Sequence, residues 1–75
     1  AGGVMRLLEY RLDAASPLTS GQLSGLHLPR GALIVAVKRD GRIFVPRGTT
    51  QLGAGDKVIV MGTPEAMQAV EARVH

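Results

Sequence analysis

Cysteine is absent from this 75-residue chain, and aromatic side chains are almost absent. Without cysteine there is neither a disulfide framework nor a thiolate metal site, and His27 and His75 are too few and too separated to build one. Tyr10 and Phe44 are the only aromatic residues, so the core must be built from aliphatic side chains and methionine. This composition predicts a single globular domain near the lower size limit for a fold held by packing alone.

Long apolar runs are missing too. No stretch approaches the roughly 20 apolar residues needed to cross a bilayer, and the first residues lack the charged-then-apolar order of a signal peptide. We therefore expect a soluble piece. Because the chain begins Ala1-Gly2-Gly3 without an initiator methionine, we interpret residues 1–3 as a linker or excision remnant. Residues 4–75 are then the domain, cut from a longer protein.

Alternation of apolar and polar residues predicts the first strand, over residues 4–12. There, Leu8, Tyr10 and Leu12 alternate with charged residues, so one face of the second half of the strand should be buried. Residues 32–37 are six consecutive apolar residues rich in β-branching. Such a run is typical of a central strand covered on both faces.

Turn and cap residues predict the remaining elements. Asp40-Gly41 supplies the positive φ angles of a two-residue type I′ turn, so residues 42–45 should form a hairpin with the strand before them. Residues 57–61 form the last predicted strand. Thr63 is a natural helix N-cap, with Pro64 at the first position of a helix that runs to Val74.

A short helix, capped by Thr19 or Ser20 and ended by Pro29, is expected over residues 19–28. The order β-α-β-β-β-α predicts a small α+β domain, with a mainly antiparallel sheet and its helices on one side. Strands at the edges of such a sheet are often protected by pairing, so a homodimer is expected.

Residues for catalysis are also missing. No serine or threonine stands with a histidine and a carboxylate in a local signature, and the six acidic residues form no recognisable pair, so we expect no enzymatic activity. The loop Gly53-Ala54-Gly55-Asp56 precedes a strand, whereas glycine loops that cradle phosphate lead into a helix. We interpret it as a tight turn that Asp56 caps through its side chain.

A basic group stands at the predicted hairpin. Lys38 and Arg39 end one strand and Arg42 begins the next, with Asp40 as the one nearby acid. Two interpretations stay open: a solvated hairpin tip that Asp40 partly compensates, and a contact for a phosphate-bearing ligand. No nucleic-acid partner is expected, because such an interface would need more charge and interleaved aromatic residues for stacking.

Four segments in this order resemble a known family. They are an L-x-L-P stop in residues 23–29, an apolar strand ending in R-D-G over residues 34–41, Val45-Pro46, and an L-x-x-G-D that leads into an apolar strand over residues 52–62. Together they resemble the TrkA-C domain, the C-terminal subdomain of RCK (regulator of potassium conductance) proteins. The resemblance covers almost the whole chain, from Val4 to Val74.

Two further segments resemble the version of this domain in bacterial potassium/proton (monovalent cation:proton) antiporters: residues 7–10 and residues 46–50. The resemblance implies a regulatory domain on the cytoplasmic side of the inner membrane, in the same polypeptide or complex as the transporter subunit. In the family the domain pairs as a dimer and senses a ligand that alters transport, which for several members is cyclic di-AMP. No G-x-G-x-x-G is present, so we expect no bound NAD and no resident cofactor, and a nucleotide such as cyclic di-AMP is the implied effector.

The positions that match the family's ligand groove lie around the apolar strand and the basic residues after it. The candidate ligand contacts are Ile34, Val35, Lys38, Arg39 and Arg42. An alternative stays open, in which the domain dimerises to hold transporter subunits together and binds no small molecule.

Overall fold

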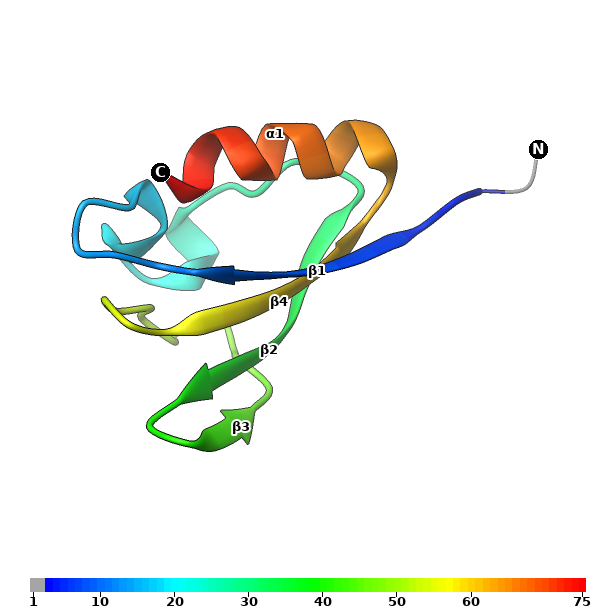
Figure 1. Cartoon of the computed structure of the whole chain (residues 1–75). Coiled ribbons are helices and arrows are strands. Elements are labelled where there is room, and N and C mark those ends of the chain that lie inside the picture. The colour runs from blue at the N-terminus through cyan, green and yellow to red at the C-terminus, as the bar shows by residue number, and fades with distance from the viewer. Residues whose placement is uncertain (1–2) are drawn as a thin grey trace.

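Four β-strands and one α-helix make up the fold in the computed structural model, which describes residues 3–75. Ala1 and Gly2 of the predicted linker lie outside the described residues. The strands are β1 (Arg6–Arg11), β2 (Ala32–Arg39), β3 (Arg42–Phe44) and β4 (Lys57–Gly62), and the helix is α1 (Pro64–Val74) (Figure 1). Two single-turn 3-10 helices, η1 (Pro17–Thr19) and η2 (Leu23–Gly25), lie between β1 and β2.

The strands form one antiparallel sheet in the order β1-β4-β2-β3. β4 is therefore central, and its Val58 stands between Tyr10 of β1 and Val37 of β2. The tight turn between β2 and β3 has positive φ angles at both central residues, 51° at Asp40 and 77° at Gly41. These angles confirm the predicted type I′ hairpin, and the pairings confirm the antiparallel sheet.

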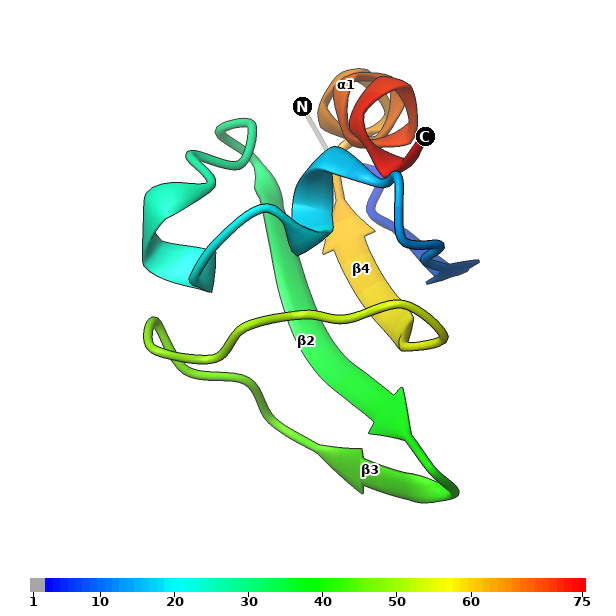
Figure 2. The same ribbon diagram turned by 90° about the vertical axis from the view of Figure 1, so that its left-hand side faces the viewer.

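α1 covers one face of this sheet, together with η1 (Figure 2). The Thr63 hydroxyl accepts a hydrogen bond from the backbone N–H of Ala66 at 3.2 Å, and Pro64 follows at the first helical position, as predicted. Val58 and Val60 of β4 alternate with more exposed neighbours and point toward the helix. The core between the two layers consists of aliphatic side chains and one methionine: Leu12, Leu18, Leu26, Ile34, Val37, Leu52, Val58, Val60, Met67, Val70 and Val74.

The segment between β1 and β2 differs from the prediction. In place of a short helix over residues 19–28, the chain makes two single turns of 3-10 helix. The cap of the first turn is Ser16, whose hydroxyl accepts a hydrogen bond from the backbone N–H of Leu18 at 3.3 Å, and not Thr19 or Ser20. A 3-10 turn tolerates Pro17 at its start and needs few residues, so it fits a segment interrupted by proline and glycine.

β2 also differs from the prediction, because only one of its faces is covered. Ile34 and Val37 are buried against the helix layer, whereas Leu33, which points to the other side, is 59% exposed. The described residues supply helices for one face of the sheet alone. The expectation of a strand covered on both faces is therefore wrong for this chain. We call the uncovered side the open face.

Candidate functional site

The three cations predicted to act together lie on two different faces of the sheet. Arg39 of β2 and Arg42 of β3 are paired across the hairpin, so their side chains leave the sheet on the same side. Lys38 is paired with Ile43 and points to the other side, the open face. Strand alternation thus divides one sequence cluster into two sites.

On the open face, Lys38 already has a partner. Its Nζ atom lies 2.9 Å from a carboxylate oxygen of Glu9, which comes from β1 on the far side of β4. This hydrogen bond, and secondarily the charge of Lys38, holds the pKa of the Glu9 carboxyl below its ordinary value. Both side chains remain about 40% exposed, so the pair contributes little to the stability of the fold.

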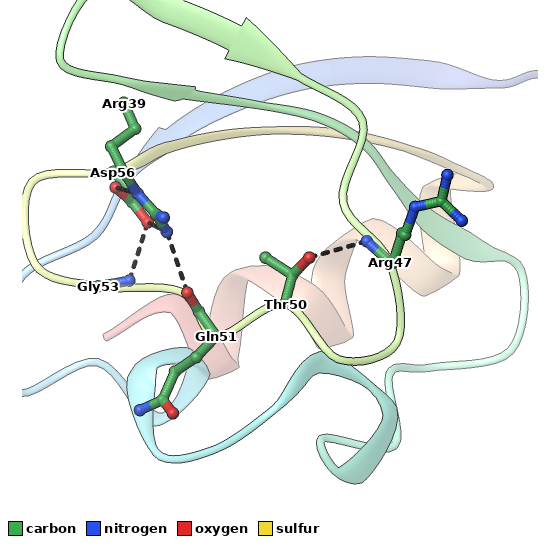
Figure 3. A network of polar contacts seen from close by, with 6 residues as sticks. All are labelled: Arg39, Arg47, Thr50, Gln51, Gly53 and Asp56. Atoms are coloured by element: carbon green, nitrogen blue, oxygen red, sulfur yellow. Dashed lines mark hydrogen bonds and ion pairs between the residues drawn. The ribbon is translucent and has the colours of Figure 1, made fainter.

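Arg39 is held from two sides by the loop that precedes β4 (Figure 3). Its Nε and Nη2 atoms donate to the two carboxylate oxygens of Asp56 at 2.9 and 2.7 Å, and Nη2 also donates to the backbone carbonyl of Gln51 at 2.9 Å. The backbone N–H of Gly53 donates to the same carboxylate at 2.8 Å, which confirms that Asp56 caps the tight turn. The bonds from Arg39 are the main reason that the pKa of Asp56 lies below its ordinary value.

A hollow of about 440 Å³ opens beside this pair, lined by Arg39, Asp40, Arg42 and Phe44. The guanidinium of Arg39 stands over the Phe44 ring, 5.2 Å from its centroid. Within residues 3–75, the Nη1 atom of Arg39 and the whole guanidinium of Arg42 donate no hydrogen bond to the protein. The hollow therefore offers several cationic N–H donors beside an apolar ring, an arrangement suited to an anion that carries a planar group.

The two apolar candidates lie further back along β2. Ile34 is 5% exposed and packs in the core, so a ligand cannot touch its side chain without moving the core. Val35 is half-buried at a β-bulge, the extra residue between Ile34 and Ala36, which are paired with Val60 and Ile59 of β4. A bulge redirects the side chain it carries, and bulges are frequent beside functional sites.

Sequence reasoning missed two cations that lie beside Lys38. The strand registers align Arg11 of β1 with Lys57 of β4, and Lys57 in turn with Lys38 of β2. We call these three residues the basic row. Arg11 and Lys57 are 46 positions apart in the sequence, since 57 − 11 = 46, so the row follows from the pairing of β1 with β4. The alternation of residues along each strand predicts the face of the sheet on which each cation lies, but not which cations stand opposite each other.

Metal ions in proteins are held by groups of particular side chains. No group of three or more histidine, cysteine, aspartate or glutamate side chains is placed there to hold a metal ion. In the same part of the chain, no helix is long and apolar enough to cross a membrane. His27 is exposed in a loop, where its backbone carbonyl accepts a hydrogen bond from Arg73 at 2.7 Å.

The family model of the TrkA-C domain matches residues 7–75. The chain belongs to the TrkA-C domain family. This TrkA-C domain is 30% identical over 71 residues to a Trk system potassium uptake protein TrkA homolog of Archaeoglobus fulgidus. It is 34% identical over 61 residues, which are 81% of the chain, to the K(+)/H(+) antiporter NhaP2 of Shewanella baltica.

The TrkA-C domain corresponds to a small part of these relatives. The Archaeoglobus match covers 95% of the chain but only 16% of that protein, and the Shewanella match covers 81% of the chain but only 11% of that antiporter. A solved structure described as "Structure of RCK domain with cda" superimposes with a TM-score of 0.79 at 26% identity, and covers 92% of this chain and 97% of its own. The resemblance drawn from the sequence is therefore confirmed at the level of family and fold.

Proposed function

We propose that this TrkA-C domain regulates a bacterial potassium transporter, of the potassium/proton antiporter type, by sensing an anionic nucleotide. The hollow at the β2–β3 hairpin carries the proposal, because its free cationic donors have no acceptor among the described side chains. Membership of a family whose relatives are named as potassium uptake proteins and a potassium/proton antiporter supports the transport role. The domain then works on the cytoplasmic side of the membrane and catalyses no reaction itself.

The ligand we propose is a nucleotide such as cyclic di-AMP. Its phosphate would accept hydrogen bonds from Arg42 and from the free edge of Arg39, while Asp56 keeps the Arg39 guanidinium in place. The Phe44 ring lines the same hollow and offers an apolar surface to a base. The related RCK domain structure, described as being "with cda", supports a small-molecule ligand for this fold.

A second copy of the domain completes the proposed sensor. β3 is three residues long and stands at the edge of the sheet. Its central residue Ile43 is 65% exposed, and Val45, which follows the strand, is 76% exposed. Exposed apolar residues at a short edge strand favour pairing with another copy. One ligand would be held between the hairpins of two copies and would bind one arrangement of the dimer more tightly than the other. This difference in affinity would shift the transporter toward the conformation that goes with the favoured arrangement.

Calorimetric titration of the domain with cyclic di-AMP, with ATP and adenosine monophosphate as controls, tests this function. We expect saturable heat at one ligand per two chains, and Arg42→Gln should weaken the affinity at least about tenfold, because it removes charge-assisted hydrogen bonds. Arg30→Gln is the matched control, because Arg30 is exposed in the loop before β2 and away from the hairpin. A dimer that gives no heat with any nucleotide would favour the alternative of a purely structural dimerisation module.

A further inference from the structure

The open face carries an exposed apolar row at the end opposite to the basic row. Leu7 of β1, Met61 of β4 and Leu33 of β2 are aligned by the strand registers. Their exposed fractions are 63%, 37% and 59%. We call these three residues the apolar row. An aligned set of large apolar side chains facing water on three neighbouring strands indicates a surface that meets a partner.

The basic row lies four residues further along β1, from Leu7 to Arg11, and four residues back along β4, from Met61 to Lys57. Like charges placed opposite each other on neighbouring strands destabilise a sheet. Glu9 is the one acid between the two rows, and it is bonded to Lys38. Arg11 and Lys57 form no ion pair within residues 3–75, so the row favours contact with negative charge from outside.

A second copy of the domain, stacked on the open face, would not supply suitable partners for both the basic row and the apolar row. When two sheets pack face to face with aligned strands, a two-fold axis along the strands sets the basic row against its own copy. An axis across the strands sets the basic row against the apolar row. In the first packing the two basic rows repel each other. In the second, the cations of the basic row are buried against leucine and methionine side chains without a charged partner. The partner must therefore offer negative charge and apolar surface together.

We propose that the open face binds the surface of an anionic phospholipid bilayer. The apolar row would enter the boundary between headgroups and acyl chains, and Arg11 and Lys57 would contact lipid phosphates. The net charge of +3 on the chain adds to this attraction. The nearness of a membrane rests on the proposed function, whereas the surface itself rests on the strand registers. The hairpin hollow lies on the other face, so ligand and bilayer occupy different sites.

Sedimentation with vesicles tests the proposal. We expect the domain to bind vesicles made of equal parts phosphatidylglycerol and phosphatidylcholine, and not vesicles of phosphatidylcholine alone. Each cation near an anionic surface strengthens binding about fivefold, so Arg11→Gln with Lys57→Gln should weaken it about 25-fold. The matched control is Arg30→Gln with Arg47→Gln, which removes the same charge from exposed loop positions outside the sheet and should retain most of the binding.

Three results would overturn the proposal. The first is equal vesicle binding by the two double variants. The second is a stable dimer that Leu33→Ser dissociates, because the apolar row would then be covered by another copy. The third is loss of nucleotide binding in Arg11→Gln with Lys57→Gln while vesicle binding persists, which would assign the basic row to a free phosphate ligand. Arg42→Gln separates the two hypotheses, since it should weaken nucleotide binding at least about tenfold and leave vesicle binding intact.

Discussion

Replacement of Asp56 by asparagine should destabilise the domain more than any other single exchange of a carboxylate for an amide in this chain. The Asp56 side chain is 4% exposed and accepts two hydrogen bonds from Arg39 and one from the backbone N–H of Gly53. Asparagine retains one carbonyl oxygen for Gly53. That oxygen, at the position of Oδ2, can still accept from Nη2 of Arg39, but the amide nitrogen that replaces Oδ1 cannot accept from Nε, and the ion pair between β2 and the turn before β4 is lost.

The expected loss is about 2 kcal/mol. Hydrogen bonds to charged groups contribute roughly 1.5–3 kcal/mol each. The bond from Nε of Arg39 is removed, and the bond from Nη2 loses its charged acceptor. The Arg39 side chain is 40% exposed, so water solvates the freed guanidinium and offsets about half of this loss. In a domain of this size, a loss of about 2 kcal/mol lowers the melting temperature by roughly 8–16 °C.

Thermal unfolding followed by circular dichroism checks this, at several protein concentrations because pairing would raise the apparent stability. Asp40→Asn is the matched control. It makes the same chemical change in the exposed hairpin turn, where φ is 51° and asparagine is equally well tolerated, so the melting temperature should stay nearly constant. If the two variants melt within about 3 °C of each other, the structural role assigned to the Arg39–Asp56 pair is wrong.

The dependence of stability on pH gives a second readout of the same pair. Because folding lowers the pKa of Asp56, its contribution is fully present above the ordinary carboxyl value of about 4 and is lost as the pH falls through the folded value. The difference in unfolding free energy between wild type and Asp56→Asn should therefore be constant from about pH 7 to pH 5 and shrink below about pH 4. A difference that grows on acidification would contradict the assignment.

Three further substitutions test the packing and the caps, each measured by urea unfolding. Leu18→Ala removes a fully buried side chain and should cost about 2–5 kcal/mol, so a loss below about 1 kcal/mol would show that η1 is not part of the core. Thr63→Ala removes the acceptor for the backbone N–H of Ala66 and should cost about 1 kcal/mol, whereas Thr63→Ser should restore most of it. Gly62→Ala places a methyl group 2.8 Å from the carbonyl oxygen of Gly31, so it should destabilise the β2–β4 pairing by roughly 1–3 kcal/mol, and an unchanged midpoint would contradict this close approach.

Local signals in the sequence predicted the elements whose geometry is decided by neighbouring residues. Asp40-Gly41 makes the type I′ turn, and Thr63-Pro64 begins the last helix, because backbone angles and caps depend on two or three residues. The secondary structure of the segment around Pro17 was harder to predict from the sequence. A few polar and apolar residues suit a short helix and a 3-10 turn equally, and docking against the core decides between them.

The candidate site was predicted only in part, because it depends on long-range contacts. Strand alternation alone separates Lys38 from Arg39, and this was available in the sequence. The partner of Arg39 was not, since Asp56 lies 17 residues away and belongs to a different element. The basic and apolar rows likewise depend on the register of β1 against β4 and on a bulge in β2. Neither the register nor the bulge can be predicted from the residues that surround it in the sequence.

The place of β1 at the edge of the sheet has a consequence for how the domain forms during synthesis. Its strand partner is β4, and 46 positions separate Arg11 from Lys57. Ribosomes add roughly 5–20 residues per second, so β1 leaves the ribosome about 2–9 seconds before β4 does. A hairpin such as β2–β3 forms in microseconds. The hairpin can therefore be complete while β1 is still unpaired, and the last step in assembling the sheet is the return of its first strand.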